Sequence, residues 1–194
     1  MPYTDVEYKF KKIGKNVAIG KSVYFRYPEL VEIGNNVIID EFCYFTTALV
    51  IEDYVHIAPH CSIVGGRESL LLMREFSGVS AGCRIVCGSD DYSGKSLTNP
   101  TVPLKYRGTP KFTTVEIGRH AVLGTNCVVH PGVSIGEGVA VGSMSLITKS
   151  LLPWGIYKGV PAQRFKERDK ENLLNLERQF KEELLRDEAN SPKR

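Results

Sequence analysis

Two adjacent carboxylates, Asp90 and Asp91, occur in the stretch IVCGSDDYSG, where a regular pattern in the chain stops. A carboxylate can bind the ammonium form of an amine, orient it, and accept the proton that the amine loses when it reacts. The alternative is a structural role, because Asp beside Ser and Gly readily forms turns. Both interpretations stay open at this point, and so does the question of which aspartate would contact an acceptor.

The pattern that stops there is a six-residue repeat. Every sixth residue is aliphatic, and the residue four positions later is small or β-branched; the aliphatic run is Ile117, Leu123, Val129, Ile135, Val141 and Ile147. A helix of period 3.6 would spread these side chains around its surface, whereas strand residues of the same parity face one side. Three short strands would close a triangular coil of about 18 residues, and coils would stack through parallel pairing. The repeat therefore predicts an all-β protein, a parallel β-helix with an aliphatic interior.

The same repeat runs earlier in the chain, from Ile13 to Ile85, with slips of register at about 26–32 and 64–72 that predict loops or bulges. We expect an N-terminal cap over residues 1–12 and a β-helix domain over residues 13–152. The domain holds about six coils, at approximately 13–32, 33–50, 51–72, 73–90, 117–134 and 135–152.

Residues 91–116 lack the repeat and are rich in Gly, Pro, Thr and Ser. A loop longer than about 12–15 residues inside a compact domain is usually functional or disordered. Its aromatic residues, Tyr92, Tyr106 and Phe112, favour order against another surface. We therefore expect a long inserted loop that begins beside the two aspartates.

The chain changes character after Pro153, and residues 153–194 are expected to form a C-terminal extension. Leu173, Leu176, Phe180 and Leu184 follow one another at spacings of three and four, which predicts an amphipathic α-helix over residues 169–187. Its charged residues are expected to form a solvated face.

Composition excludes several classes of function. The chain has 194 residues, a net charge of only +3 and 24% charged residues, so no nucleic-acid partner is expected. No apolar run approaches the length of a membrane-spanning helix, and the N-terminus has no apolar segment typical of a signal peptide. Five cysteines without paired spacing favour reduced thiols and a cytoplasmic protein. Four of them fall in the small-residue position of the repeat, where buried and inert thiols are expected, and Cys87 lies outside that position.

The stretch EIGRHAVLGTNCVVHPGVSIGEGVAVGSMSLITKSLLPWGIYKGVPAQRF resembles the left-handed β-helix, or hexapeptide-repeat, acyltransferases. Its ending is similar to that of galactoside, maltose and other sugar acetyltransferases, and the resemblance covers about residues 13–167. It implies a left-handed coil, a homotrimer with active sites in the grooves between subunits, and use of acetyl-CoA or another acyl-CoA as co-substrate.

The resemblance also implies which residues bind the acyl donor. Backbone amides near VGSMS hold the pantetheine arm in relatives, and basic residues near the chain's end meet the nucleotide phosphates. Carried over to this sequence, the cofactor-binding positions are Gly124, Thr125, Gly142, Ser143, Thr148, Lys149, Arg164 and Lys166. One departure is that Gln163 stands directly after GVPA, where relatives have a basic residue.

A second departure concerns the general base. Many relatives that acetylate hydroxyl groups have a histidine where the coils give way to the loop, and this chain has none there. Its four histidines fall in outward or corner positions of the repeat, where each is expected at the surface: His56, His60, His120 and His130. His130 is the nearest to the expected acyl site and is kept as a reserve base. His56 and His60 do not reproduce the spacing of the zinc-binding histidines in β-helix carbonic anhydrases, so no metal is expected.

Without that histidine, the carboxylates favour an amine acceptor, because a deprotonated amine attacks a thioester without a strong base. Some sugar N-acyltransferases of this fold have Asp at the loop start, and this chain is similar to them in DDYSG and LTNPTVP. The candidate catalytic residues are thus Asp90, Asp91 and His130. The candidate acceptor-binding residues are Asp90, Asp91, Tyr92 and Asn99, with Lys105 and Arg107 for a nucleotide diphosphate.

The sequence therefore predicts an acyl-CoA-dependent acyltransferase that acts on a nucleotide-linked amino sugar, in surface-polysaccharide (lipopolysaccharide) biosynthesis. Two alternatives stay open: a sugar O-acetyltransferase of the galactoside or maltose type, and a β-helix trimer that serves only as a scaffold. The GSMSLITK and GVPA elements count against the scaffold, which has no need of a groove for CoA.

Overall fold

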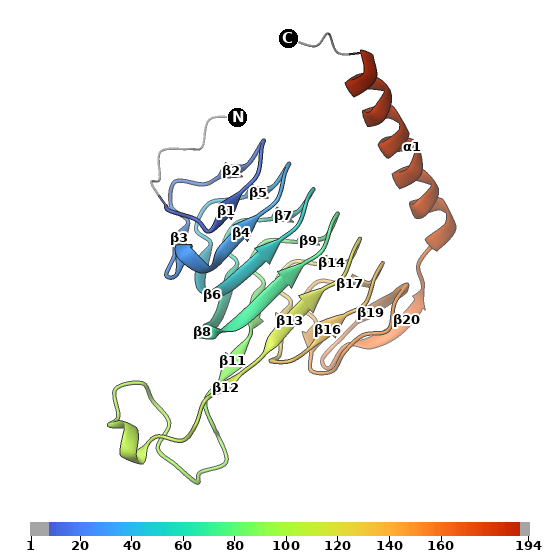
Figure 1. The fold of residues 1–194 in the computed structure, drawn as a ribbon. Helices are drawn as coiled ribbons and strands as arrows, with labels where there is room; N and C mark the ends of the chain where they lie inside the picture. Colours follow the sequence, from blue (N-terminus) through green and yellow to red (C-terminus); the bar gives the residue numbers. More distant parts are fainter. Residues whose placement is uncertain (1–7, 191–194) are drawn as a thin grey trace.

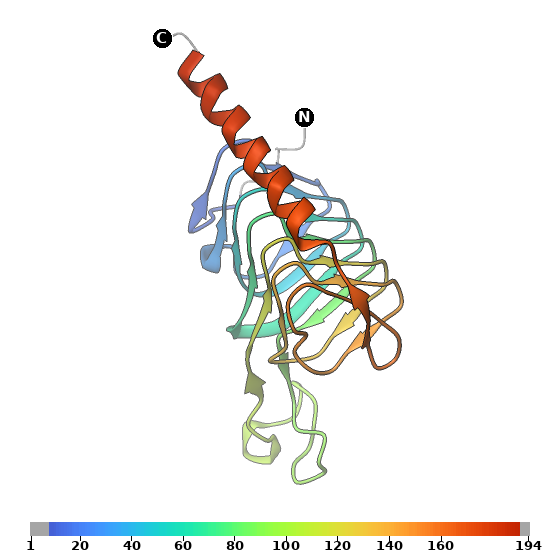
Figure 2. The same ribbon diagram turned by 90° about the vertical axis from the view of Figure 1, so that its right-hand side faces the viewer.

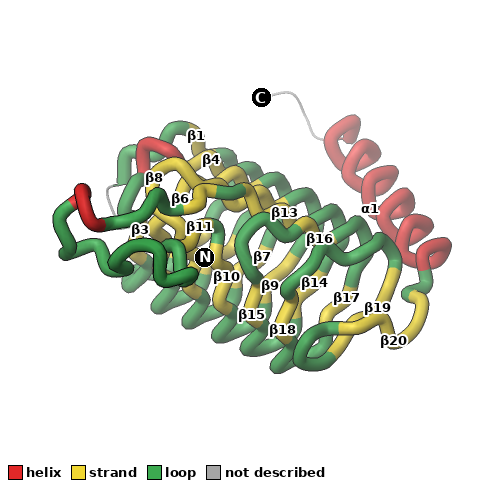
Figure 3. Tube along the Cα trace, turned by 90° about the horizontal axis from the view of Figure 1, so that it is seen from below, coloured by secondary structure: helices red, strands yellow, loops and turns green. Residues whose placement is uncertain are grey.

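The chain winds into a stack of coils built from short parallel strands (Figure 1), and the coils follow one another in a row (Figure 3). The computed structural model describes residues 8–190. Residues 1–7 of the expected N-terminal cap and residues 191–194 of the expected extension lie outside the described part. Each complete coil contributes to three flat faces, which we number in the order in which the chain first forms them. The predicted all-β architecture of stacked parallel coils is confirmed.

The strands divide among the faces as follows. Face one contains β1 (Lys12–Ile13), β4 (Val31–Ile33), β13 (Thr114–Ile117), β16 (Ser134–Ile135) and the second halves of β6 (Tyr44–Ile51) and β8 (Ser62–Met73). Face two contains β2 (Ala18–Ile19), β5 (Ile38–Ile39), β7 (His56–Ile57), β9 (Gly78–Val79), β14 (Val122–Leu123), β17 (Ala140–Val141) and β19 (Gly155–Lys158). Face three contains β3 (Tyr24–Phe25), β10 (Arg84–Val86), β15 (Val128–Val129), β18 (Leu146–Ile147) and the first halves of β6 and β8.

The interior is a set of aliphatic ladders. On face one, Ile33, Ile51, Met73, Ile117 and Ile135 lie in register from coil to coil, and each side chain is buried. All of the aliphatic positions predicted from Ile117 onward are also buried. Burial of such a side chain contributes about 1.5–3 kcal/mol, so the ladders supply the main stabilisation of the stack.

The stack continues beyond the last predicted coil. Ile156 and Tyr157 of β19 pair with β17 on face two, and Leu151 forms a parallel bridge with Ile135 on face one. The chain therefore begins a further coil where an extension was expected from residue 153. Leu151 follows Ile147 by four residues instead of six, and this shortened step hides the coil in the sequence.

Both predicted slips of register are confirmed as irregular backbone. The first contains the short 3-10 helix η1 (Pro28–Leu30). The second is a bulge within β8, where the pairing with β6 passes from Val64 to Gly66 and then to Leu70. The hydroxyl of Thr47 donates a hydrogen bond of 2.7 Å to the Ser69 carbonyl and closes the bulge against β6.

The inserted loop leaves and re-enters the stack through a narrow stem (Figures 1 and 2). The stem is an antiparallel pair of β11 (Gly88–Ser89) and β12 (Lys111–Phe112). The expected loop, residues 91–116, ends too late, because Thr114–Ile117 already form β13 and pair with Leu70–Met73 of β8. We call residues 90–110 the excursion. It holds the short 3-10 helix η2 (Leu104–Tyr106).

The C-terminal helix α1 (Lys170–Asn190) extends slightly beyond the predicted range of 169–187. It follows the antiparallel strand β20 (Gln163–Glu167) and crosses the stack obliquely (Figure 2). Asp169 caps it, because its carboxylate accepts a hydrogen bond of 3.0 Å from the amide of Asn172. Within residues 8–190, no helix has the length and apolar character needed to cross a membrane.

One side of α1 docks on the stack through charged residues, which the sequence did not predict. Glu177 is buried and accepts hydrogen bonds from Arg119 at 2.6 and 2.8 Å. Its other partners are His120 at 2.9 Å and Lys181 at 2.8 Å. The expected surface position of His120 is wrong, since only 7% of the residue is exposed. The expectation that the helix charges are solvated is wrong for Glu177.

Four of the five cysteines lie in the small-residue position of the repeat, and burial was expected for these four. All five are free and buried, including Cys87. Burial raises the pKa of the Cys87 thiol to about 12, so the thiol stays protonated at neutral pH. These are interior thiols, and their contribution is to packing.

Candidate active site

A cavity of about 460 Å³ opens where the excursion leaves the stack. It brings together five residues that the sequence singled out and four that it did not. The first group is Asp90, Asp91, Tyr92, His130 and Thr148, and the second is Ser89, Lys111, Thr113 and Pro131. Residues from three coils and from both strands of the stem therefore meet at one place.

Parallel stacking explains why these residues meet. On face three, β10, β15 and β18 run parallel, with Ile85, Val129 and Ile147 in register. The residues that follow each strand consequently lie at the same corner of the prism. His130 is fixed there by its amide, which donates a hydrogen bond of 2.9 Å to the Ile147 carbonyl, and Thr148 follows on the next coil.

Asp91 has a structural role in this corner. One of its carboxylate oxygens accepts a hydrogen bond of 2.9 Å from the amide of Ser93, and the other accepts one of 2.8 Å from the Ser93 hydroxyl. The Ser93 amide and then the Ser93 hydroxyl hold the pKa of this carboxyl below its usual range. Asp91 thus forms the turn that the structural alternative predicted, and both of its oxygens are engaged.

Asp90 differs from its neighbour. Among residues 8–190, its carboxylate has no hydrogen-bond donor within range, and its ion-pair partner is Arg107, with Nη2 3.9 Å from Oδ1. About 27% of the side chain is exposed. Of the two adjacent carboxylates, Asp90 therefore has more hydrogen-bonding capacity left for a ligand.

The other residues predicted to bind the acceptor are spread along the excursion. Tyr92 lines the cavity and is 80% exposed. The Asn99 side chain accepts hydrogen bonds from the amide and hydroxyl of Thr101, which makes it a turn residue. Lys105 places its ammonium 4.8 Å from the ring centre of Tyr106. Neither Asn99 nor Lys105 lines the cavity.

Four positions predicted to bind CoA form one corner, between faces two and three. Gly124 and Thr125 stack directly on Gly142 and Ser143 of the next coil. The Gly124 amide donates to the Val141 carbonyl, and the Gly142 amide donates to the Tyr157 carbonyl, each at 2.8 Å. A side chain on Gly124 would come within 2.6 Å of the Ser143 amide nitrogen, so glycine is needed for this close stacking. Because these glycines have no side chain, a ligand can approach the backbone closely at this corner. Their own N–H groups are already used in hydrogen bonds between coils.

The remaining CoA positions lie directly after β18 and on β20. Thr148 is in the cavity, and Lys149, beside it, is exposed. Arg164 and Lys166 lie on the exposed strand β20. Arg164 forms an ion pair of 2.6 Å with Glu167 and packs on the Tyr157 ring. The structure does not bring Arg164 or Lys166 into the cavity with Asp90.

Three of the four missed lining residues depend on the stem. Lys111 pairs with Ser89 across the two antiparallel strands. Thr113 is held by its amide and hydroxyl, which donate to the Cys87 carbonyl at 2.9 and 2.6 Å. The strand after the excursion carries no repeat that would reveal this pairing, so no sequence signal was available for Lys111 or Thr113.

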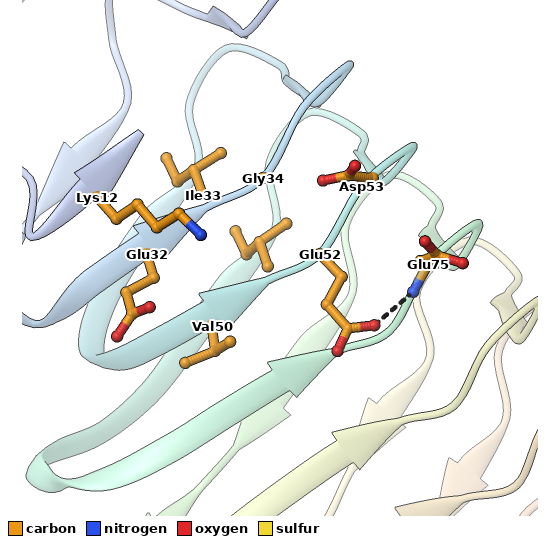
Figure 4. A pocket seen from close by; sticks show the side chains of 9 residues that line it. Lys12, Glu32, Ile33, Gly34, Val50, Glu52, Asp53 and Glu75 are labelled. Atoms are coloured by element: carbon orange, nitrogen blue, oxygen red, sulfur yellow. Dashed lines mark hydrogen bonds between the residues drawn. The ribbon is translucent and has the colours of Figure 1, made fainter. Parts of the chain in front are cut away.

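A second cavity, of about 370 Å³, lies on face one and is lined by more carboxylates (Figure 4), but these already have partners within the protein. Glu32 pairs with Lys11 at 2.7 Å, Glu52 pairs with Arg74 at 2.9 Å, and Asp53 accepts two hydrogen bonds from Asn35. These groups connect adjacent coils. Within the described residues, no group of three or more His, Cys, Asp and Glu side chains is arranged to hold a metal ion.

Comparisons with known proteins agree with this geometry. Residues 114–149 match the family described as bacterial transferase hexapeptide (six repeats). The chain is 35% identical over 184 residues to dTDP-4-amino-4,6-dideoxy-D-glucose acyltransferase of Escherichia coli, covering 93% of this chain and 94% of the relative.

Solved structures give the same result. AntD, an N-acyltransferase from Bacillus cereus in complex with dTDP and 3-hydroxybutyryl-CoA, matches with a TM-score of 0.84 and 37% identity, over 90% of this chain and 92% of that one. Galactoside acetyltransferase in complex with coenzyme A shares the fold, with a TM-score of 0.58 and 20% identity, over 84% of this chain and 68% of that one. Given relatives of this identity and coverage, the chain belongs to the hexapeptide-repeat acyltransferases.

Proposed function

We propose that the protein transfers an acyl group from an acyl-CoA to the amine of a nucleotide-linked amino sugar. The observation that carries this proposal is the cavity in which the Asp90 carboxylate, held only by a loose ion pair with Arg107, lies with His130 and Thr148 at one corner of the prism. The absence of a histidine at the start of the excursion favours an amine over a hydroxyl acceptor.

In the proposed reaction, the sugar amine arrives as an ammonium ion and is drawn to Asp90. It loses a proton through the carboxylate to water, and the neutral nitrogen attacks the thioester carbonyl carbon. A nitrogen–carbon bond forms, the nitrogen gives up a second proton, and the carbon–sulfur bond breaks. The sulfur leaves with one proton as the CoA thiol. Asp90 contributes attraction, orientation and a route for the first proton.

The other proposed roles follow from position. Tyr92 contacts the acceptor beside Asp90, and Asp91 holds the turn that presents them. Asn99, Lys105 and Arg107 are the remaining acceptor-side candidates on the excursion. On the donor side, the corner of Gly124, Thr125, Gly142 and Ser143 takes the pantetheine arm, with Thr148 and Lys149 beside β18. Arg164 and Lys166 on β20 would reach the nucleotide phosphates of CoA.

The relatives support the substrate class. A single-residue mutant of AntD has been solved with dTDP-4-amino-4,6-dideoxyglucose and coenzyme A, and the Escherichia coli relative is named for acylation of the same sugar nucleotide. Another relative, 33% identical over 131 residues, is a putative lipopolysaccharide biosynthesis O-acetyltransferase of Escherichia coli. We infer a role in building a surface polysaccharide, carried out by a cytoplasmic homotrimer.

The test is release of the CoA thiol from acetyl-CoA and 3-hydroxybutyryl-CoA in the presence of different acceptors. The acceptor panel contains dTDP-4-amino-4,6-dideoxyglucose, a free amino sugar, and a sugar that carries only hydroxyl groups. We expect turnover with the amino-sugar nucleotide and little with the hydroxyl-only sugar. No thiol release together with no affinity for CoA would contradict the proposal and favour the scaffold.

One observation supports a second candidate, a sugar O-acetyltransferase. His130 lies in the same cavity as Asp90, where it could take the proton of a hydroxyl acceptor. Replacing His130 with Gln separates the two, because an O-acetyltransferase would lose turnover with hydroxyl acceptors, whereas amine acylation through Asp90 would largely persist.

A further inference from the structure

Arg107 has an unsatisfied group in an otherwise well-paired chain. Among residues 8–190, two buried side-chain polar atoms lack a hydrogen-bond partner, and one of them is Nε of Arg107. Only 22% of this side chain is exposed. A buried donor without a partner costs free energy and is uncommon in folded proteins, so this guanidinium is placed for a reason other than its own stability.

The backbone around Arg107 fixes where the guanidinium lies. The Arg107 amide donates a hydrogen bond of 3.1 Å to the Leu104 carbonyl, and Arg107 forms a parallel bridge with Leu97. At Gly108, an added Cβ would lie 2.3 Å from Oγ of Ser96 and 3.6 Å from Cβ of Asp91. Glycine therefore lets the returning chain press against the start of the excursion, which brings Arg107 beside Asp90.

The ion pair between Arg107 and Asp90 is loose. The distance of 3.9 Å exceeds that of a hydrogen bond, and both side chains are partly exposed. A bidentate pair would occupy both carboxylate oxygens and compete with any ligand. A loose and partly exposed pair contributes little to stability, yet it still favours one direction of the carboxylate.

We propose that Arg107 is a positioning residue that holds the Asp90 carboxylate over the cavity and yields it to the acceptor ammonium. This inference rests on the proposed function. It differs from a role for Arg107 in binding the nucleotide diphosphate. A phosphate that reached this guanidinium would also approach the Asp90 carboxylate, and the two negative charges would repel each other.

The experiment compares Arg107→Gln, Arg107→Lys, Asp90→Asn and the double variant Arg107→Gln/Asp90→Asn. Their kcat and acceptor KM are measured with dTDP-4-amino-4,6-dideoxyglucose. We expect Arg107→Gln to raise the acceptor KM about fivefold with little change in kcat, and Arg107→Lys to recover part of the loss. In the Asp90→Asn background, Arg107→Gln should have almost no further effect, because it acts through that carboxylate.

Binding of dTDP alone, measured by calorimetry, separates positioning from phosphate contact. We expect wild type and Arg107→Gln to bind dTDP equally well. Lys95→Gln removes a positive charge from the same excursion and is the matched control, with unchanged KM. A loss of dTDP affinity in Arg107→Gln, or an undiminished effect of Arg107→Gln in the Asp90→Asn background, overturns the inference.

The proposed function and the role of Arg107 are tested separately by these measurements. Turnover by the wild-type protein with an unchanged acceptor KM in Arg107→Gln would leave the proposed function in place and remove the role of Arg107. A wild-type protein that acylates no amine would overturn the proposed function, and the inference with it.

Discussion

At the scale of single residues, the adjacent aspartates Asp90 and Asp91 have different surroundings. Both carboxylate oxygens of Asp91 are engaged by Ser93, whereas Asp90 has only the loose pair with Arg107. Both residues line the same cavity, but Asp91 closes a turn, whereas Asp90 makes no such contact. The structure therefore favours Asp90 as the residue that contacts the acceptor amine.

We predict that Asp90→Asn raises the acceptor KM about 10- to 100-fold, the value of a lost hydrogen bond to a charged group. Steady-state kinetics with an amino-sugar nucleotide provide the measurement. Asp91→Asn is the matched control, because asparagine also forms this type of turn, and it should change the free energy of unfolding by no more than about 0.5 kcal/mol. Equal effects of the two substitutions on KM would argue against a special role for Asp90.

The thiols give a second prediction at this scale. All five cysteines are buried, which keeps reagents away from the sulfur atoms, and burial raises the pKa of the Cys87 thiol to about 12, so almost no Cys87 thiolate forms at pH 8. A disulfide reagent that reports thiolate attack should find no fast-reacting thiol in the native protein and five after unfolding in guanidinium chloride. Rapid reaction of Cys87 in the native protein would show that the corner beside the excursion opens.

Five of the nine residues that line the candidate site were named from the sequence, but their contacts were not predicted. Asp90, Asp91 and Tyr92 were proposed because the repeat stops there, Thr148 because of the resemblance to the acyltransferases, and His130 because it is near the expected acyl site; all five line one cavity. The choice between the aspartates depends on two hydrogen bonds to Ser93, which no periodicity encodes. Lys111 and Thr113 were missed for the same reason, since they reach the cavity through an antiparallel stem.

At the scale of elements, α1 is attached to the stack by a mixed aromatic and ionic contact. Phe180 packs edge-on against Tyr54 and Phe76, with ring centres 5.3 and 6.1 Å apart. Tyr54, Phe76 and His120 stack on one another along the corner, at 4.9 and 5.1 Å. The ion pairs of Glu177 lie beside this stack. The leucine spacing predicted an amphipathic helix, but it could not show that a glutamate would be its most buried residue.

We predict that Glu177→Gln weakens the docking of α1 by about 1–3 kcal/mol, because Arg119 and Lys181 lose a charged acceptor. The single tryptophan, Trp154, lies under Lys170 at the start of the helix and reports docking by its fluorescence. The midpoint temperature of thermal unfolding should fall by roughly 2–4 °C for each kcal/mol of stability lost. Glu182→Gln removes an exposed carboxylate from the same helix and should have little effect; a Glu177→Gln protein as stable as this control would contradict the prediction.

The same carboxylate predicts a response to acid. Burial opposes the ionisation of Glu177, but Lys181, His120 and Arg119 outweigh it and hold the pKa of its carboxyl below 4.5. A lowered folded-state pKa stabilises the protein above pH 4.5, and that stabilisation is lost as the pH falls through the folded-state value. Wild-type stability should therefore decrease below pH 4.5 more steeply than that of Glu177→Gln. The free energy of unfolding of both proteins is measured as the pH is lowered. An equal decrease for the two proteins would contradict this prediction.

At the scale of the whole molecule, the repeat was sufficient to predict the fold, because each coil imposes the same register on the next. Ile117 to Ile147 identified the ladders directly. The last coil was missed, since Leu151 breaks the spacing and Tyr157 replaces an aliphatic residue in its ladder. The packing of α1 on a corner depends on contacts between distant parts of the chain, so sequence periodicity does not contain it.

Large apolar side chains are exposed in the turns between the faces, where assembly of several copies would bury them. Phe42 is 60% exposed, Met144 67%, and Leu152 70%. We predict a particle in solution with three times the 21.6 kDa mass of the chain, measured by light scattering coupled to size exclusion. A mass of a single chain at micromolar concentration would contradict the proposed homotrimer.

The stem of the excursion separates the excursion from the packing of the coils, so the sequence and length of the excursion can vary independently of the core. The chain leaves at Cys87 and returns at Thr113, which are hydrogen-bonded to each other, and Thr114–Ile117 then pair with Leu70–Met73. The coils on the two sides of the stem stack as if the intervening residues were absent. We therefore expect that the excursion can be lengthened or shortened without altering a core contact between the coils. Under the proposed function, a change in the excursion would alter the acceptor that related enzymes use. The proposed CoA-binding surface on the coils would stay the same.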